Sequence, residues 1–162
     1  MAHIHEKIDF TASVYVVQAG KVLLHKHKKL GIWLPPGGHI ELTDDPNEAA
    51  VREVEEESGL IITLLGNKRL PNAPHDGSQD LIPPFFINRH YFNDVHEHID
   101  FIYFGTVVSG TIRPEEAGGE IEWVDRKVIE DNTLELKEAI RAYALAALDY
   151  FSKINLESKT GF

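Results

Sequence analysis

The segment from Gly37 to Leu60, GGHIELTDDPNEAAVREVEEESGL, constrains the fold more than any other part of the chain. Asp45 is a preferred N-cap residue, Pro46 suits the first helical position, and Glu48 completes a capping-box pattern. Gly59 is of the residue type that most often follows the end of a helix. The sequence therefore predicts a helix with a defined start and a defined end, preceded by a glycine-rich loop.

Extended segments lie on both sides of this helix in the sequence. Phe10–Gln18 is rich in β-branched and aromatic residues, and a turn at Ala19 and Gly20 leads into a second extended segment, which indicates a hairpin. Further strands are expected near Trp33 and over residues 60–70, 85–91, 98–108 and 123–124, and a second helix over residues 132–151. This order predicts an α/β sandwich with a mixed sheet.

The length and composition predict one domain. The chain has 162 residues, of which 43% are hydrophobic and 9% aromatic, as in ordinary globular proteins. We expect a single domain over residues 1–162, with a core over about 10–151 and a loosely held tail over 152–162. The chain has no cysteine, so any bound metal must be held by oxygen or imidazole ligands.

Charge and hydropathy restrict the partners. The formal net charge of −10 argues against the basic surface that binding to a nucleic-acid polymer needs. A phosphorylated ligand would therefore bind through cations. The N-terminal residues lack the apolar run of a signal peptide, and no later segment approaches the roughly 20 apolar residues of a membrane span. We expect a soluble, cytoplasmic protein that does not bind membranes.

Three glutamates share one face of the predicted helix. Because a helix turns about 100° per residue, Glu53, Glu56 and Glu57 lie within an arc of roughly 100°. Only Arg52, four residues before Glu56, offers local compensation for this charge. An acidic face of this kind is often simply solvated.

The glycines before the helix favour a metal site over a solvated face. Gly37 and Gly38 let the backbone approach the carboxylates, and the carbonyl of Gly37 can act as a further oxygen ligand. Clustered carboxylates and a carbonyl suit Mg²⁺ or Mn²⁺, which commonly bring phosphate oxygens with them.

The same segment resembles the signature of the Nudix hydrolase family. That signature is Gly, five residues, Glu, seven residues, and then Arg-Glu-aliphatic-any-Glu-Glu-any-Gly-aliphatic. The residues that match it are Gly38, Arg52, Glu53, Val54, Glu56, Glu57, Gly59 and Leu60. The exception is Asp44, which keeps the charge of the usual Glu but is shorter by one methylene.

The resemblance implies a fold, a reaction and residue roles. The fold would be the Nudix-type α/β/α sandwich, and the reaction a metal-dependent cleavage of a diphosphate linkage in a nucleoside diphosphate derivative or nucleoside triphosphate. Glu56 and Glu57 would bind the Mg²⁺ or Mn²⁺ ion. Glu53 would be a further ligand or the base for the attacking water, and Arg52 would orient the glutamates by salt bridging. The alternatives are a non-catalytic domain that senses a nucleotide, and an isomerase of the same fold.

A further carboxylate is expected on the opposite wall of the cleft, because the helix presents its glutamates from one side only. Glu120 is the first candidate as an additional metal ligand, since two glycines precede it and Trp123 can anchor the segment. Glu97 is the second candidate, because it lies among polar residues. The remaining candidates are Glu115, Glu116 and Glu122.

Weaker patterns leave their alternatives open. His96, His98 and Asp100 alternate along a predicted strand, so they share a face and form either a second metal site or a polar lining held by hydrogen bonds. The basic run His25–Lys29 either contacts a phosphate or is a solvated strand end.

Substrate and assembly are the least constrained by the sequence. The aromatic side chains that either stack on a base or belong to the core are Trp33, Phe85 and Phe86. An oxidised nucleoside triphosphate, a dinucleotide and a nucleotide sugar are all compatible small-molecule substrates. A homodimer is expected only because it is the commonest assembly among soluble oligomers.

Overall fold

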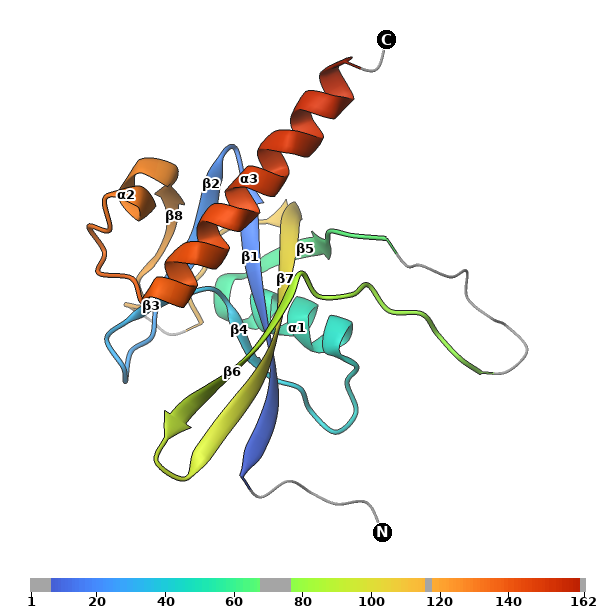
Figure 1. The fold of residues 1–162 in the computed structure, drawn as a ribbon, viewed down its shortest axis with the longest axis vertical. Helices are drawn as coiled ribbons and strands as arrows, with labels where there is room; N and C mark the ends of the chain where they lie inside the picture. The colour runs from blue at the N-terminus through green and yellow to red at the C-terminus, as the bar shows by residue number, and fades with distance from the viewer. Residues whose placement is uncertain (1–6, 68–76, 116–117, 161–162) are drawn as a thin grey trace.

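The computed structural model describes residues 7–67, 77–115 and 118–160. Within these residues the chain forms a sheet with helices packed on it (Figure 1). The strands are β1 (Ile8–Gln18), β2 (Lys21–Lys26), β3 (Trp33–Leu34), β4 (Gly37–His39), β5 (Leu60–Leu64), β6 (Phe86–Asn93), β7 (His96–Gly110) and β8 (Ile121–Asp125). The helices are α1 (Pro46–Ser58), α2 (Arg126–Glu130) and α3 (Glu138–Thr160).

The sheet is built around β1 and β7. These strands run parallel, and their pairing extends from Ile8 with Glu97 to Val16 with Gly105. The other strand pairs are antiparallel, so the sheet is mixed as predicted. The main path has the order β3-β2-β1-β7-β5, while β4 pairs with β1, β6 with β7, and β8 with β2.

Helices cover both faces of the sheet. Val54 of α1 belongs to the same buried cluster as Val14 of β1, whereas Ala144 of α3 belongs to the cluster that contains Tyr15. Neighbouring residues of a strand point to opposite faces, so the two clusters lie on opposite sides of the sheet. Figure 1 shows α3 crossing in front of the sheet and α1 behind it. This arrangement is the predicted α/β/α sandwich.

Helix α1 begins and ends where the sequence predicts. The Asp45 carboxylate accepts hydrogen bonds from the backbone N–H groups of Asn47 and Glu48, at 2.7 and 3.0 Å. The Glu48 carboxylate accepts one from the Asp45 N–H at 2.9 Å. Gly59 has a left-handed backbone with φ of 71°, and its N–H donates to the Glu55 carbonyl at 2.8 Å. These contacts confirm the capping box and the glycine at the helix end.

The C-terminal helix differs from the prediction at both ends. Helix α3 begins at Glu138 and not at residue 132, because Asn132 and Glu135 have left-handed backbones with φ of 52° and 54°. It continues to Thr160, so the helix includes residues 152–160 and does not end at residue 151 as expected. Their sequence contains no Gly or Pro before Gly161, so nothing in it stops the helix.

The structure contains two short elements that the sequence does not predict. Gly37–His39, expected as loop, forms β4 by pairing with β1. Residues 126–130, which lie between the last predicted strand and the last predicted helix, form α2. Both elements are too short to give a periodic signal, and the pairing of β4 depends on a strand far away in the sequence.

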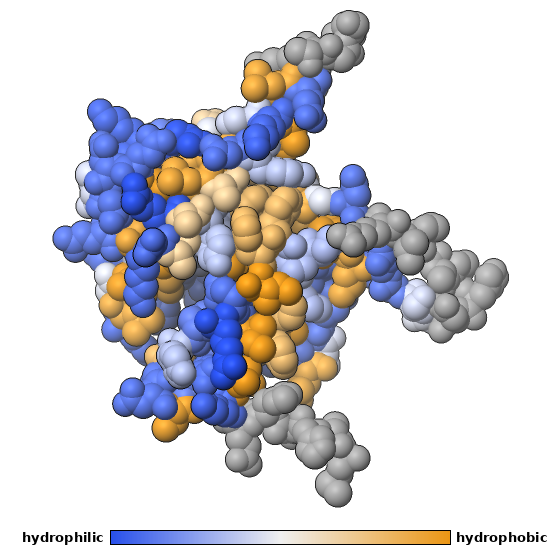
Figure 2. All heavy atoms as spheres, in the orientation of Figure 1, coloured by the Kyte–Doolittle hydropathy of each residue, from blue (hydrophilic) through white to orange (hydrophobic). Residues whose placement is uncertain are grey.

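The surface is mostly polar on the face that carries α3. Hydrophilic side chains surround a smaller apolar area in the middle of this face (Figure 2). Large apolar side chains that are exposed include Ile87, Tyr91 and Phe92 of β6. Among the helices in the described ranges, none has the length and apolar character needed to cross a membrane.

Candidate active site

Arg52 joins the acidic residues of the loop and helix into one charged cluster. Its Nη1 donates to the carboxylates of Glu53, at 2.7 Å, and Glu56, at 3.1 Å. Its Nε donates to the Asp44 carboxylate at 3.0 Å, and its Nη2 to the His39 carbonyl at 3.1 Å. Asp44 therefore holds the guanidinium group on one side while two glutamates contact it on the other. An arginine fixed by four acceptors in turn fixes the carboxylates it contacts.

Glu53 lies directly against the glycine-rich loop. Its side chain is 15% exposed, and a Cβ atom on Gly38 would lie 2.5 Å from its carboxylate carbon. Burial raises the pKa of Glu53, and the contact with Arg52 opposes this rise. Any side chain at position 38 would therefore displace the Glu53 carboxylate from its place against the loop.

Glu57 is held by the backbone of the loop. The Gly37 N–H donates to Glu57 Oε2 at 2.9 Å. His25 Nε2 lies 3.5 Å from the same oxygen, but burial lowers the pKa of His25, which keeps the imidazole neutral at neutral pH. Neither contact brings a full positive charge to the carboxyl group. Burial, with the negative charges of Glu53 and Glu115 nearby, raises the pKa of Glu57 to about 8.

A cleft of about 240 Å³ opens beside Glu57. It is lined by the basic run His25–Lys29 and, from the segment that leads from β7 into β8, by residues 114–115 and 119–121. In that segment the Glu120 carboxylate is 55% exposed and accepts a hydrogen bond from Lys26 Nζ at 3.0 Å. Glu115 lies closer to the glutamates, since its backbone N–H donates to the Glu57 carbonyl at 3.2 Å and its charge acts on the Glu57 carboxyl. Lysines and carboxylates therefore meet in one cleft.

The arrangement of loop, helix and sheet matches a known family. The NUDIX domain family model matches residues 8–147. The chain belongs to the Nudix hydrolase family. A solved Nudix-family hydrolase from Clostridium perfringens is 36% identical in sequence, with a TM-score of 0.75 and with 88% of this chain and 97% of that chain covered.

Two curated relatives match over shorter lengths. The protein named Probable DHNTP pyrophosphohydrolase from Lactococcus lactis subsp. cremoris is 27% identical over 103 residues, which is 62% of this chain and 55% of that protein. The m7GpppN-mRNA hydrolase NUDT17 from Xenopus laevis is 47% identical over 59 residues, 33% of this chain and 20% of that protein. The chain thus spans about half or less of the length of these relatives.

Of the remaining carboxylate candidates, Glu97 forms its ion pairs away from Arg52 and the glutamates of α1. Glu97 lies on β7 and is 1% exposed. Arg89 Nε donates a hydrogen bond to Glu97 Oε2, and Lys7 Nζ lies 2.8 Å from Glu97 Oε1. These cations hold the pKa of Glu97 at about 2. Glu122 is exposed on β8, and Glu116 lies outside the described residues. The contacts of Glu97 connect strands and do not point to catalysis.

The polar residues of β7 divide into two groups. The buried Asp100 accepts hydrogen bonds from Thr11 Oγ1 at 3.0 Å and Ser13 Oγ at 2.9 Å. Burial raises the pKa of Asp100, and the hydroxyl groups oppose the rise. His96 and His98 lie further along β7, among residues of other strands. Asp100 therefore does not share a set of candidate ligands with the two histidines.

The three aromatic candidates for stacking on a base differ in their burial. Trp33 is 8% exposed in the core, and Phe85 stacks on Phe104 with ring centres 4.1 Å apart. Phe86 is 39% exposed, and its ring lies 4.9 Å from that of Tyr143. Among the three, Phe86 alone presents a large exposed area to a ligand.

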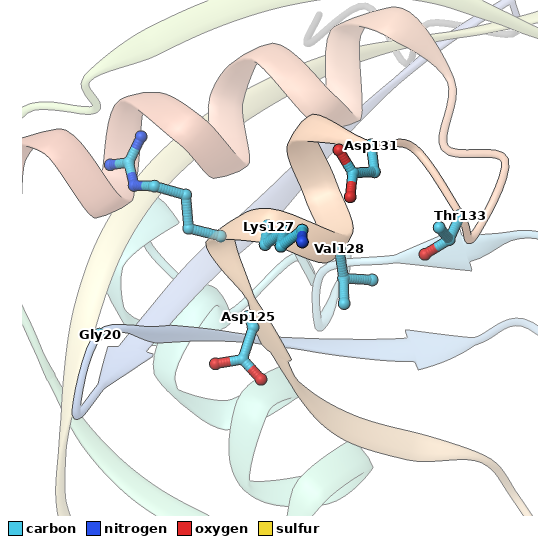
Figure 3. Close-up of a pocket in the computed structure, with 7 residues that line it drawn as sticks. Gly20, Asp125, Lys127, Val128, Asp131 and Thr133 are labelled. Carbon is cyan, nitrogen blue, oxygen red and sulfur yellow. The ribbon is translucent and has the colours of Figure 1, made fainter.

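A larger cavity, of about 540 Å³, lies elsewhere in this Nudix fold (Figure 3). It is lined by Gly20, Asp125, Arg126, Lys127, Val128, Asp131 and Thr133, from the β1–β2 turn, the end of β8, α2 and the loop that follows. Among the described residues, it shares no lining residue with the cleft at Glu57. Although it is the larger of the two cavities, it is not lined by residues of the signature.

Proposed function

We propose that this protein is a divalent-metal-dependent pyrophosphohydrolase that cleaves a diphosphate linkage in a nucleoside diphosphate derivative or a nucleoside triphosphate. The position of Glu57 carries the proposal. Its carboxyl group is fixed by the Gly37 N–H and crowded by other glutamates, and the cleft beside it is lined by His25–Lys29. A carboxyl group that lacks a full positive partner, next to a basic strand end, suits joint binding of a metal ion and a phosphate group.

The donor atoms of the cluster fit Mg²⁺ or Mn²⁺, because they are carboxylate and carbonyl oxygens. Glu56 and Glu57 would hold the ion, and the Gly37 carbonyl would add an oxygen. A bound ion would neutralise the diphosphate and lower the pKa of a water molecule. Glu53 would be a further ligand or accept the proton of the attacking water. Arg52 would keep two glutamates in place, since its Nη1 contacts both.

Substrate class follows from charge and from the relatives. The Lactococcus lactis protein carries pyrophosphohydrolase in its name, which supports diphosphate chemistry for this chain. A net charge of −10 favours a small nucleotide over a nucleic-acid polymer. The absence of cysteine accords with a reducing, cytoplasmic setting, and we retain a homodimer as part of the proposal.

Formation of cleavage products from a panel of nucleotides, with and without Mg²⁺ or Mn²⁺, tests this function, with nucleoside phosphates, phosphate and pyrophosphate separated by chromatography. The panel includes oxidised nucleoside triphosphates, dinucleotides and nucleotide sugars. Metal-dependent products are expected from at least one class. Binding without products would instead indicate a sensing domain, and a rearranged product with its diphosphate linkage intact would indicate an isomerase.

Glutamine variants extend the test to residues. Glu56→Gln and Glu57→Gln should each lower turnover at least about a hundredfold, or about 2.7 kcal/mol of barrier, while the fold is kept. Glu55→Gln is the matched control, because Glu55 lies on the same helix but is exposed, and it should retain wild-type turnover. Near wild-type turnover in both test variants would show that the metal site lies elsewhere.

A further inference from the structure

The strands β4 and β7 both lie beside β1 (Figure 1). Three histidines and one aspartate meet on these strands. Asp9 lies on β1 and His39 ends β4. His96 and His98 lie on β7. Each of these four residues, here named the histidine cluster, offers one ligand atom, and the four atoms all lie within 4.8 Å of one another. Asp9 Oδ2 is 2.9 Å from His96 Nε2 and 3.5 Å from His39 Nε2.

The strand pairing places these side chains on one face of the sheet. Asp9 is the partner of His98 across β1 and β7, and His39 is the partner of Thr11 across β4 and β1. Cross-strand partners project from the same face, as do residues two apart along a strand. Tyr15 projects from that face too and packs in the cluster under α3. The histidine cluster therefore lies on the α3 side, further along the same strands.

His98 lies at the centre of a group of rings. It is 8% exposed, and Phe92 stacks on its imidazole with ring centres 5.1 Å apart. His90, His39 and His96 lie edge-on to it at 5.3, 5.2 and 5.3 Å. Burial and the neighbouring imidazoles lower the pKa of His98 to about 4.

We propose that the histidine cluster is a binding site for Zn²⁺, separate from the carboxylate site on α1. Three imidazoles and one carboxylate form a ligand set for Zn²⁺, whereas Mg²⁺ prefers oxygen alone. Bonds of about 2.0–2.1 Å in a tetrahedral site separate the ligand atoms by about 3.4 Å. The distances from Asp9 to His96 and His39 are close to this value. The His39 side chain is 54% exposed and has room to rotate towards the others.

His39 connects this site with the signature. Its side chain belongs to the histidine cluster, and its carbonyl accepts the hydrogen bond from Arg52 Nη2 at 3.1 Å. An ion bound by the cluster would join β1, β4 and β7. It would thereby also steady the backbone to which Arg52 is anchored.

Titration of metal-depleted protein with Zn²⁺ against a chromogenic chelator, with excess Mg²⁺ present to occupy the carboxylates, tests this site. Wild type should bind one Zn²⁺ per chain, and the Glu56→Gln/Glu57→Gln variant should bind it as tightly. His39→Ala and His96→Ala should each weaken binding at least about a hundredfold, because each removes a ligand. Co²⁺ in place of Zn²⁺ should give the visible absorption of a four-coordinate site in wild type and lose it in the two histidine variants.

Matched histidine variants exclude other sources of binding. His27→Ala removes a histidine of the basic run and should keep wild-type affinity. His3→Ala/His5→Ala removes two histidines outside the described residues and should also keep it. Circular dichroism checks that His39→Ala, at an exposed position, is folded. The proposal is overturned if wild type binds no Zn²⁺, if both single cluster variants bind it as wild type does, or if the glutamine or His3/His5 variant loses it.

Discussion

At the scale of single residues, Glu57 combines a fixed position with an unusual protonation equilibrium. The Gly37 N–H holds its carboxyl group, while burial and the charges of Glu53 and Glu115 raise its pKa to about 8. In the metal-free protein this group therefore carries a proton at neutral pH. A metal ion that binds there must displace that proton, so the affinity for Mg²⁺ should fall as the pH falls.

The raised pKa of Glu57 predicts how the stability of the metal-free protein depends on pH. The folded value of about 8 lies above the ordinary value of 4.5, so between these values the folded state holds a proton that the unfolded state has lost. The contribution of Glu57 to the free energy of unfolding therefore decreases as the pH rises from about 4.5 to about 8. Glu57→Gln should remove this decrease, as measured by melting in the presence of a chelator.

Comparison of variants isolates this effect from other titrating groups. Glu55→Gln should follow the wild-type dependence on pH, because Glu55 is exposed on the same helix. Excess Mg²⁺ should stabilise wild type most at the alkaline end of the range. Identical pH dependence in wild type and Glu57→Gln would show that the carboxyl group is already ionised at neutral pH.

Helical periodicity was sufficient to group the glutamates, because residues three and four apart on one helix are neighbours in any fold. It also paired Arg52 with Glu56. Two contacts could not be predicted from the sequence: that of Arg52 with Asp44, and that of Asp9 with His39. Each joins segments whose distance in space depends on how the strands and the loop pack. The nearness of Glu115 to Glu57 depends on the same packing and has no signal in the sequence.

At the scale of elements, local signals decide how well each boundary is predicted. Helix α1 has a capping box at Asp45 and a left-handed glycine at its end, so its limits follow from neighbouring residues. Helix α3 has no comparable start signal, because Asn132 binds the Leu136 N–H through its side chain in a loop that precedes the helix. The apolar pattern therefore extended the predicted helix back into this loop.

The segment between β7 and β8 places Glu115 next to Glu57 of α1. If the proposed function holds and the Glu115 carboxylate completes the metal site beside Glu57, Glu115→Gln should lower turnover at least about tenfold, roughly 1.4 kcal/mol of barrier. Glu120→Gln should have a smaller effect, since that carboxylate is paired with Lys26 and is 55% exposed. Steady-state assays of the two variants at saturating Mg²⁺ measure the difference.

The same assays distinguish chemistry from folding. Both variants should melt within a few degrees of wild type, because neither carboxylate is part of the core. Glu122→Gln, an exposed change on β8, is the control for substitution near this segment. A larger loss in Glu120→Gln than in Glu115→Gln would show that Glu120, the first candidate from the sequence, is the carboxylate that matters for turnover.

At the scale of the whole molecule, Glu97 joins three parts of the chain. It lies on β7, Lys7 immediately precedes β1, and Arg89 belongs to β6. Its folded pKa of about 2 lies below the ordinary value of 4.5, so its ionised form stabilises the folded state. That contribution is fully present above about 4.5 and is lost as the pH falls towards about 2.

Glu97→Gln should therefore lower the melting temperature at neutral pH, and its difference from wild type should shrink as the pH falls from about 4.5 towards about 2. Added salt should also reduce the difference, because the side chains of Lys7 and Arg89 are 61% and 57% exposed. Glu122→Gln again provides the control. A difference that stays constant over this pH range would mean that Glu97 acts through packing and not through its charge.

The parallel pairing of β1 with β7 also decides when the protein can fold during its synthesis. β1 and β2 are adjacent in sequence, and α1 follows soon after, so these elements can form early. The other edge of β1 pairs with β7, from Ile8 opposite Glu97 onwards, and that partner is made much later. At roughly 5–20 residues per second, the ribosome leaves this edge without its partner for several seconds or longer. The nascent chain is therefore most open to mispairing and to chaperone binding along β1, until the ribosome has released β7.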